Sequence, residues 1–107
     1  MIAVLFGGAF ELHASHAPGN PEAGETIFME SCQHCHGPKG KGDGQMAEYL
    51  DPRPKNLTSD STQSKTDDEL RKVIIEGRPG TAMAGVEESL SDAQLIDLIA
   101  YIRTLKP

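Results

Sequence analysis

The sequence contains no tryptophan, and aromatic residues make up only 5% of its 107 positions. Hydrophobic residues account for 37%, which is a small supply for the interior of a domain of this length. The apolar stretch at residues 1–10 is too short to span a bilayer as a helix. We therefore expect one domain with a thin core.

Basic residues are also scarce: 10 Lys and Arg stand against 16 Asp and Glu, giving a net charge of −6 and a pI near 5.1. This balance argues against a nucleic-acid partner, which needs a basic face, and against docking to anionic lipid. The uneven placement of charge either steers a docking partner or is merely a solvated surface. The basic loop residues are Lys39, Lys41, Arg53, Lys55 and Arg78, and the acidic residues towards the C-terminus are Glu87, Glu88, Asp92 and Asp97.

The chain has only two cysteines, Cys32 and Cys35, and His36 follows directly after the second. This spacing is the attachment signature for c-type haem. The two thiols would add to the haem vinyl groups, and the imidazole would supply the proximal nitrogen of the iron. The sequence therefore predicts one covalently attached haem c. Because such a group would also complete the thin core, we expect the haem-free chain to fold poorly.

Three other uses of these residues fit less well. A thioredoxin-like dithiol follows a strand, whereas residues 24–31 read as helix. A structural zinc site needs four ligands, and the remaining histidines, His13, His16 and His34, form no second pair. A disulfide would explain the cysteines but not His36.

A methionine between small residues indicates a second iron ligand. Residues 77–85 form a loop by composition, and Met83 lies within it. A thioether suits haem iron, and His/Met ligation raises the reduction potential. The alternatives are an ordinary gap-filling methionine, or ligation by Met46 instead.

The hydrophobic and capping patterns are all-α, with no strand-period segment. Asn20 with Pro21 predicts a helix to about residue 31 or 33, and the glycine-rich residues 37–44 predict a tight loop. The remaining expectations are a short helix over 45–50, a polar surface loop over 58–65, and capping boxes that begin helices at Thr66 and Ser91.

The N-terminal residues 1–17 are expected to be an export leader or a retained extension, leaving residues 18–107 as the haem domain. The apolar part is followed by small residues at 14–17, but no basic segment precedes it. Haem attachment normally occurs outside the cytoplasm, so we expect a periplasmic or otherwise exported protein. If the segment is retained, His13 and His16 become candidate second-haem or intermolecular ligands, or are simply surface residues.

Taken together, these motifs resemble the class I cytochromes c, specifically the small bacterial monohaem type, over about residues 20–106. The resemblance implies the cytochrome c fold, with three core helices and a short helix wrapped around one haem. The first and last helices of that family cross, and Gly24 would let Tyr101 approach closely. The matching residues are Gly24 with Phe28, residues 32–37, residues 40–44, residues 80–83 and Tyr101.

The resemblance also suggests further site residues. Arg53 and Asn56 look like hydrogen-bonding partners of a haem propionate or of the methionine loop, although Arg53 could instead face solvent. Ala84 follows Met83 where the family often has proline, which would make this loop softer.

The implied function is electron transfer without catalysis, because two axial ligands leave no open iron site. Expected partners are redox proteins: a quinol-oxidising complex or dehydrogenase as donor, and an oxidase, reductase or photosynthetic centre as acceptor, without membrane insertion of the mature domain. One alternative is a fixed haem relay in a larger oxidoreductase. Another is a ligand-binding or peroxidatic haem protein, which would require an absent or labile Met83 ligand.

Overall fold

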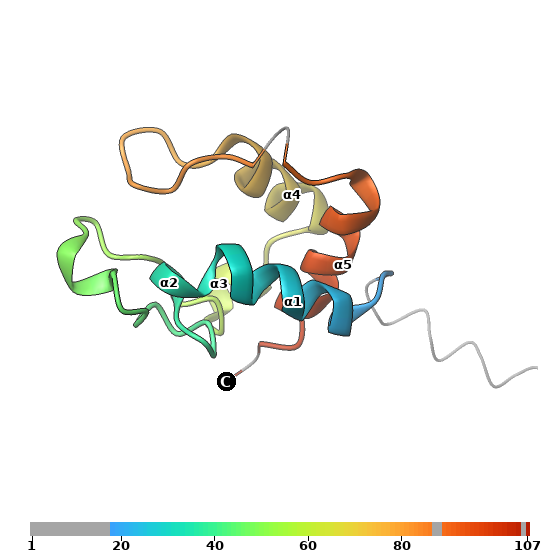
Figure 1. Ribbon diagram of the computed structural model, residues 1–107, viewed down its shortest axis with the longest axis horizontal. Coiled ribbons are helices and arrows are strands. Elements are labelled where there is room, and N and C mark those ends of the chain that lie inside the picture. Colours follow the sequence, from blue (N-terminus) through green and yellow to red (C-terminus); the bar gives the residue numbers. More distant parts are fainter. Residues whose placement is uncertain (1–17, 87–88, 106) are drawn as a thin grey trace, which may run out of the picture.

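The computed structural model describes residues 18–86, 89–105 and 107. Predictions that concern residues 1–17, including His13 and His16, or the charges of Glu87 and Glu88 lie outside the described residues. The described part is helical and contains no named strand, so the all-α prediction is confirmed (Figure 1). Its elements are α1 (Pro21–Ser31), α2 (Gln33–His36), the 3-10 turn η2 (Ala47–Tyr49), α3 (Asp60–Gln63), α4 (Asp67–Glu76) and α5 (Asp92–Ile102).

The three long helices begin at the side chains that the sequence predicts. The Asn20 side chain accepts a hydrogen bond from the amide of Glu22 at 2.9 Å and so caps α1. The Thr66 hydroxyl accepts from the amide of Glu69 at 3.0 Å, and the Glu69 carboxylate accepts from the amide of Thr66 at 2.8 Å. Ser91 and Gln94 make the same reciprocal pair at the start of α5. These bonds satisfy amides that have no partner inside a helix.

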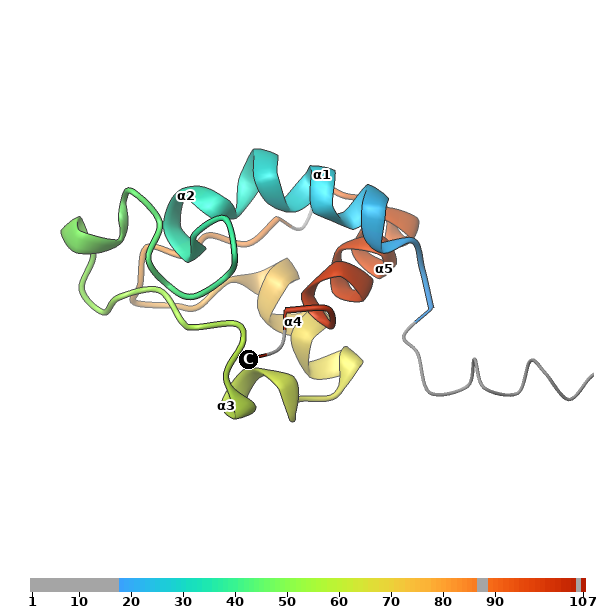
Figure 2. The same ribbon diagram turned by 90° about the horizontal axis from the view of Figure 1, so that it is seen from below.

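The core forms where α1 packs against α5, and α4 packs against the other side of α5 (Figures 1 and 2). The helices meet closely at Gly24, where an added Cβ would lie 2.0 Å from the carbonyl oxygen of Asp97 and 2.9 Å from Cβ of Tyr101. The predicted close approach of Tyr101 to Gly24 is therefore confirmed. Phe28 is fully buried beside it, with its ring centre 5.2 Å from that of Tyr101. The buried apolar cluster consists of Phe28, Leu70, Ile74, Leu95, Leu98, Ile99 and Ile102.

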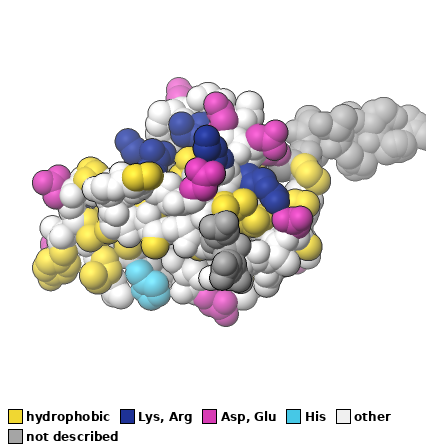
Figure 3. All heavy atoms as spheres, turned by 90° about the horizontal axis from the view of Figure 1, so that it is seen from above, with side chains coloured by type: hydrophobic (Ala, Val, Ile, Leu, Met, Phe, Trp, Pro, Cys, Tyr) yellow, Lys and Arg dark blue, Asp and Glu magenta, His cyan; other side chains and the backbone are white. Residues whose placement is uncertain are grey.

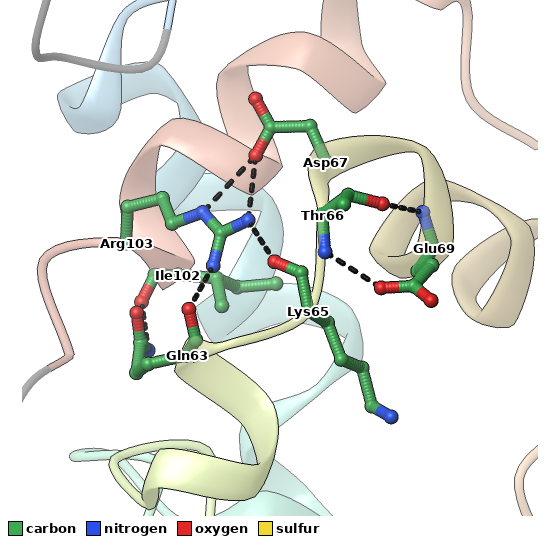
Figure 4. Close-up of polar contacts among 7 residues, drawn as sticks. All are labelled: Gln63, Lys65, Thr66, Asp67, Glu69, Ile102 and Arg103. Atoms are coloured by element: carbon green, nitrogen blue, oxygen red, sulfur yellow. Dashed lines mark hydrogen bonds and ion pairs between the residues drawn. The ribbon is translucent and has the colours of Figure 1, made fainter.

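The prediction of a polar surface loop over residues 58–65 is wrong. The helical turn α3 occupies part of this range, and Thr58 and Thr62 are buried. Two side chains bind this segment to the end of α5 (Figure 4). The Gln63 amide donates to three backbone carbonyls, those of Leu57, Ile102 and Leu105. Arg103 donates to the carbonyls of Gln63 and Lys65 and to the carboxylate of Asp67.

The short helix expected over residues 45–50 is a 3-10 turn, η2, which begins at Ala47. Two further single turns, α2 and α3, accompany the long helices, so the short elements outnumber the one that the family resemblance implied. No helix among the described residues combines the length and the apolar character that crossing a membrane requires.

Candidate functional site

Cys32 joins α1 to α2, and Cys35 lies in the single turn of α2. The amide of Cys32 donates to the carbonyl of Phe28 and ends α1, and the amides of Cys35 and His36 then donate to the carbonyl of Cys32 at 3.3 and 3.0 Å. Both cysteines are half-buried and are not joined in a disulfide. One short turn therefore presents two free thiols and an imidazole.

The chemistry of Cys32 differs from that of a redox-active dithiol. Burial, together with a smaller effect of the neighbouring Cys35, raises the pKa of the Cys32 thiol to about 11. Redox cysteines of the Cys-x-x-Cys type have a lowered pKa, because the thiolate is the reactive form. In the described part of the chain, moreover, no three His, Cys, Asp or Glu side chains gather as a metal-ion cluster.

The imidazole of His36 is held by a backbone carbonyl. Its Nδ1 lies 3.0 Å from the carbonyl oxygen of Lys55, so this nitrogen is the donor of the hydrogen bond and Nε2 keeps its lone pair. Burial lowers the pKa of His36; the Lys55 carbonyl opposes this shift, and the nearby Arg78 charge lowers the pKa further. A neutral ring with one anchored nitrogen is the form that binds iron.

The glycine-rich loop folds back over α2. The amide of Gly42 donates to the carbonyl of His36 at 2.7 Å, and the amide of Gly44 donates to the carbonyl of Cys35 at 3.0 Å. An added Cβ at Gly44 would lie 2.3 Å from the carbonyl oxygen of His34, so a side chain there would push the loop away. The predicted tight loop thus satisfies the last carbonyls of α2.

Arg53 and Asn56 lie on the extended strap, residues 51–57, that brings the Lys55 carbonyl to His36. Both side chains are exposed. The side-chain oxygen of Asn56 accepts from the amide and the hydroxyl of Thr58, at 2.9 and 2.7 Å. This oxygen therefore already has hydrogen-bond partners within a local turn. The predicted hydrogen bond to a propionate would have to come from the side-chain nitrogen of Asn56 or from Arg53.

Met83 lies half-buried on the loop between α4 and α5. Its amide donates to the Thr81 hydroxyl at 3.1 Å, and its carbonyl accepts from the amide of Arg78 at 3.1 Å. An isolated antiparallel bridge between Gly77 and Ala84 closes the base of the loop. Both ribbon views place the loop over residues 77–86 at the same end of the molecule as α2 (Figures 1 and 2). Hydrophobic side chains gather at that end, beside a histidine (Figure 3).

Sequence reasoning missed two contributors to this site. The Lys55 carbonyl is a backbone group, which carries no sequence signal of its own. Arg78 was predicted only as a loop charge, yet its guanidinium acts on His36. Its position five residues before Met83, in the same loop, was the one available hint.

The donor set fits a covalently bound haem. Two free thiols on one turn can form two thioethers, and an anchored imidazole with a free Nε2 can bind the iron. The Nδ1 hydrogen bond to a backbone carbonyl is the orientation that metal-binding histidines require.

Comparison with known proteins supports this interpretation. The family model described as "Cytochrome c" matches residues 21–106. Cytochrome c-554(547) of Halothiobacillus neapolitanus is 30% identical over 90 residues, which are 82% of this chain and 99% of that protein. Dihydro-heme d1 dehydrogenase of Pseudomonas aeruginosa is 33% identical over 94 residues, covering 88% of this chain.

Among solved structures, a chain of the reducing HAO-like protein complex from Kuenenia stuttgartiensis superposes with a TM-score of 0.70 at 25% identity, covering 79% of this chain and 42% of that one. The present chain also spans only 16% of the Pseudomonas dehydrogenase. Domains similar to this one thus occur both as a whole small cytochrome and within longer chains. The chain belongs to the cytochrome c family, and it is an electron-transfer domain that carries covalently attached haem c.

Proposed function

We propose that this domain is a monohaem electron carrier in which Cys32 and Cys35 hold the haem, and His36 and Met83 fill the two axial positions. The observation that carries the proposal is the turn from Cys32 to His36, with both thiols free and the imidazole anchored on the Lys55 carbonyl. Bound haem supplies an iron that cycles between the ferric and ferrous states.

The protein's own part is to hold this group without rearrangement. The cysteines fix it at two points, and the Lys55 carbonyl keeps the His36 ring in one orientation and one tautomer. A second protein ligand would leave no open coordination position, so the proposal includes no catalysis by this domain.

The geometry favours Met83 over Met46 as the second ligand. The Met46 amide donates to the carbonyl of His34 at 2.9 Å, so Met46 lies beside the turn that carries His36. If His36 holds the iron from its own turn, a second ligand would have to come from a different segment. Met83 belongs to a separate loop, closed at its base by the Gly77–Ala84 bridge and half-buried at the same end of the molecule.

Three polar side chains are assigned roles beside the haem, those of Arg53, Asn56 and Arg78. Arg53 and Asn56 would bind a haem propionate or the methionine loop from the strap. Arg78 would place a positive charge near the iron, as its effect on His36 supports. A cation there disfavours the ferric state and so raises the reduction potential.

The partners and the place of action extend the same proposal. We expect an exported, periplasmic carrier that accepts electrons from a quinol-oxidising complex or a dehydrogenase and delivers them to an oxidase, reductase or photosynthetic centre. The hydrophobic side chains beside the histidine in Figure 3 would form a small, transient contact surface of the kind that redox encounters use.

Absorption spectroscopy of the haem-loaded protein tests the ligation. The natural protein should show a ferric sulfur-to-iron charge-transfer band and no response to carbon monoxide in the ferrous state. Met83→Ala should lose the band and bind carbon monoxide, whereas the matched variant Met46→Leu should behave as the natural protein does. Ready binding of carbon monoxide by the natural protein would instead indicate a ligand-binding or peroxidatic haem.

A fixed haem relay is the second candidate. It is supported by relatives in which a similar domain is part of a much longer chain, including a dehydrogenase of which this chain spans 16%. Stable co-purification with an oxidoreductase under native conditions would favour the relay, and recovery as a separate small protein would favour the free carrier.

A further inference from the structure

The carbonyl that anchors His36 lies on a strap without helical hydrogen bonds of its own. Lys55 is exposed, and residues 51–57 form no helix or strand. The length of the bond from Nδ1 to this carbonyl therefore depends on what holds the strap in place.

Leu57 holds the end of the strap through two hydrogen bonds, one from its amide and one to its carbonyl. The Leu57 amide donates to the carbonyl of Gly40 at 2.6 Å, which ties the strap to the glycine loop. The Leu57 carbonyl accepts from Nε2 of Gln63 at 2.8 Å. Leu57 itself packs against the hydrophobic core. These contacts, together with the hydrogen bonds that the Ser59 and Thr62 hydroxyls donate to the carbonyl of Asn56, hold the backbone next to the Lys55 carbonyl.

Gln63 connects the strap to the far end of the chain. Its Nε2 also lies 3.0 Å from the carbonyl of Ile102 and 3.2 Å from that of Leu105. Its own backbone carbonyl accepts from Nη1 of Arg103 at 3.0 Å (Figure 4). The Gln63 amide thus links the strap, at Leu57, to the C-terminal end of the chain, at Ile102 and Leu105. If this donor were removed, the three half-buried carbonyls would each lose a hydrogen-bond partner.

We propose that Gln63 is a positioning residue for the axial histidine: its amide fixes the strap against the end of α5, and so sets the strength of the hydrogen bond from His36 to the Lys55 carbonyl. A strong bond at Nδ1 makes the imidazole a better electron donor and stabilises ferric iron. Loosening the strap weakens that bond and raises the reduction potential. The inference rests on the proposed ligation by His36.

Gln63→Met tests this, because it keeps a similar size and removes the donor without adding charge. The matched control is Arg71→Met, which cuts the ion pair between Arg71 and Asp92 and so loosens α4 from α5 without touching the strap. The two readouts are the reduction potential and the exchange of the His36 Nδ1 proton with solvent, followed by NMR. Gln63→Met should raise the reduction potential. It should also speed the exchange of the His36 Nδ1 proton about fivefold, because losing one hydrogen bond of typical net strength changes an equilibrium by about that factor. Arg71→Met should change neither.

The outcomes separate this inference from the proposed function. If the natural protein shows no iron-shifted Nδ1 proton from His36, the proposed ligation itself is wrong. If that proton is present, but its exchange and the potential are the same in Gln63→Met as in the natural protein, Gln63 serves stability alone and the inference is wrong.

Gln63→Glu gives a second test that does not depend on the methionine variant folding. An ionised carboxylate cannot donate to the three carbonyls, whereas a protonated carboxyl can donate to one of them. The potential and the proton exchange should depart from the natural values at neutral pH and return towards them in acid. A difference from the natural protein that does not change with pH would overturn the proposal.

Discussion

Replacing Gly24 with alanine should separate α1 from α5 at the centre of the core. The new Cβ would lie 2.0 Å from the carbonyl oxygen of Asp97, whereas ordinary contact begins at 3.4 Å. The helices must therefore move apart by about 1.4 Å at this point. The same shift strains the hydrogen bond from the amide of Asn20 to the Asp97 carboxylate, which is 2.9 Å long.

The expected loss of stability follows from two opposing terms. Overpacking against backbone, which cannot change rotamer, costs about 3 kcal/mol. Alanine is a better helix former than glycine, which returns about 1 kcal/mol. The net loss of about 2 kcal/mol should lower the midpoint of thermal unfolding by about 10 °C.

Far-UV circular dichroism of the haem-loaded protein measures this midpoint. Thr26→Ala, at an exposed position of the same helix, is the control and should stay within about 0.5 kcal/mol of the natural protein. A Gly24→Ala protein that unfolds at or above the natural temperature would show that α1 and α5 do not meet at Gly24, and the packing argument would be refuted.

Three further predictions concern the site and its support. Met83→Ala should leave the haem attached but lower the reduction potential, as electrochemistry would show; an unchanged potential would exclude Met83 as ligand. Arg78→Met should lower the potential by an amount on the order of tens of millivolts, because it removes a cation near His36, whereas the exposed Lys72→Met should have little effect. The hydrogen bond from the Thr66 amide lowers the pKa of the Glu69 carboxyl in the folded protein. The ionised carboxylate therefore stabilises the fold fully at pH values above the pKa that Glu69 has in the unfolded chain. This stabilisation is lost as the pH falls through the lower pKa of the folded state. Denaturant unfolding at several pH values should show this acid loss in the natural protein and a smaller one in Glu69→Gln; equal acid dependence of the two would contradict it.

Features that depend on near neighbours in the chain could be predicted from the sequence. The capping pair of Thr66 with Glu69 forms within one turn, and its geometry follows from residue type and spacing. The turn from Cys32 to His36 is local for the same reason. The family resemblance supplied one long-range contact, that of Gly24 with Tyr101, which residue spacing alone would not have shown.

Features that depend on distant partners were missed. Residues 58–65 are polar and were predicted to be a surface loop, because nothing nearby indicates that Arg103, about forty residues further on, binds their carbonyls. The carbonyl of Lys55 was missed as a partner of His36, because every residue has such a group and only the path of the chain selects one.

The sequence by itself determined the chemistry of this protein. Two thiols three positions apart and a following histidine specify covalent haem attachment, because the reacting groups lie within one turn. The tertiary structure decided how that chemistry is tuned. The acceptor of His36, the charge of Arg78 and the Gln63 contacts that hold the strap depend on segments brought together only by packing of the helices, and the energy of such contacts depends on distances that no local pattern encodes.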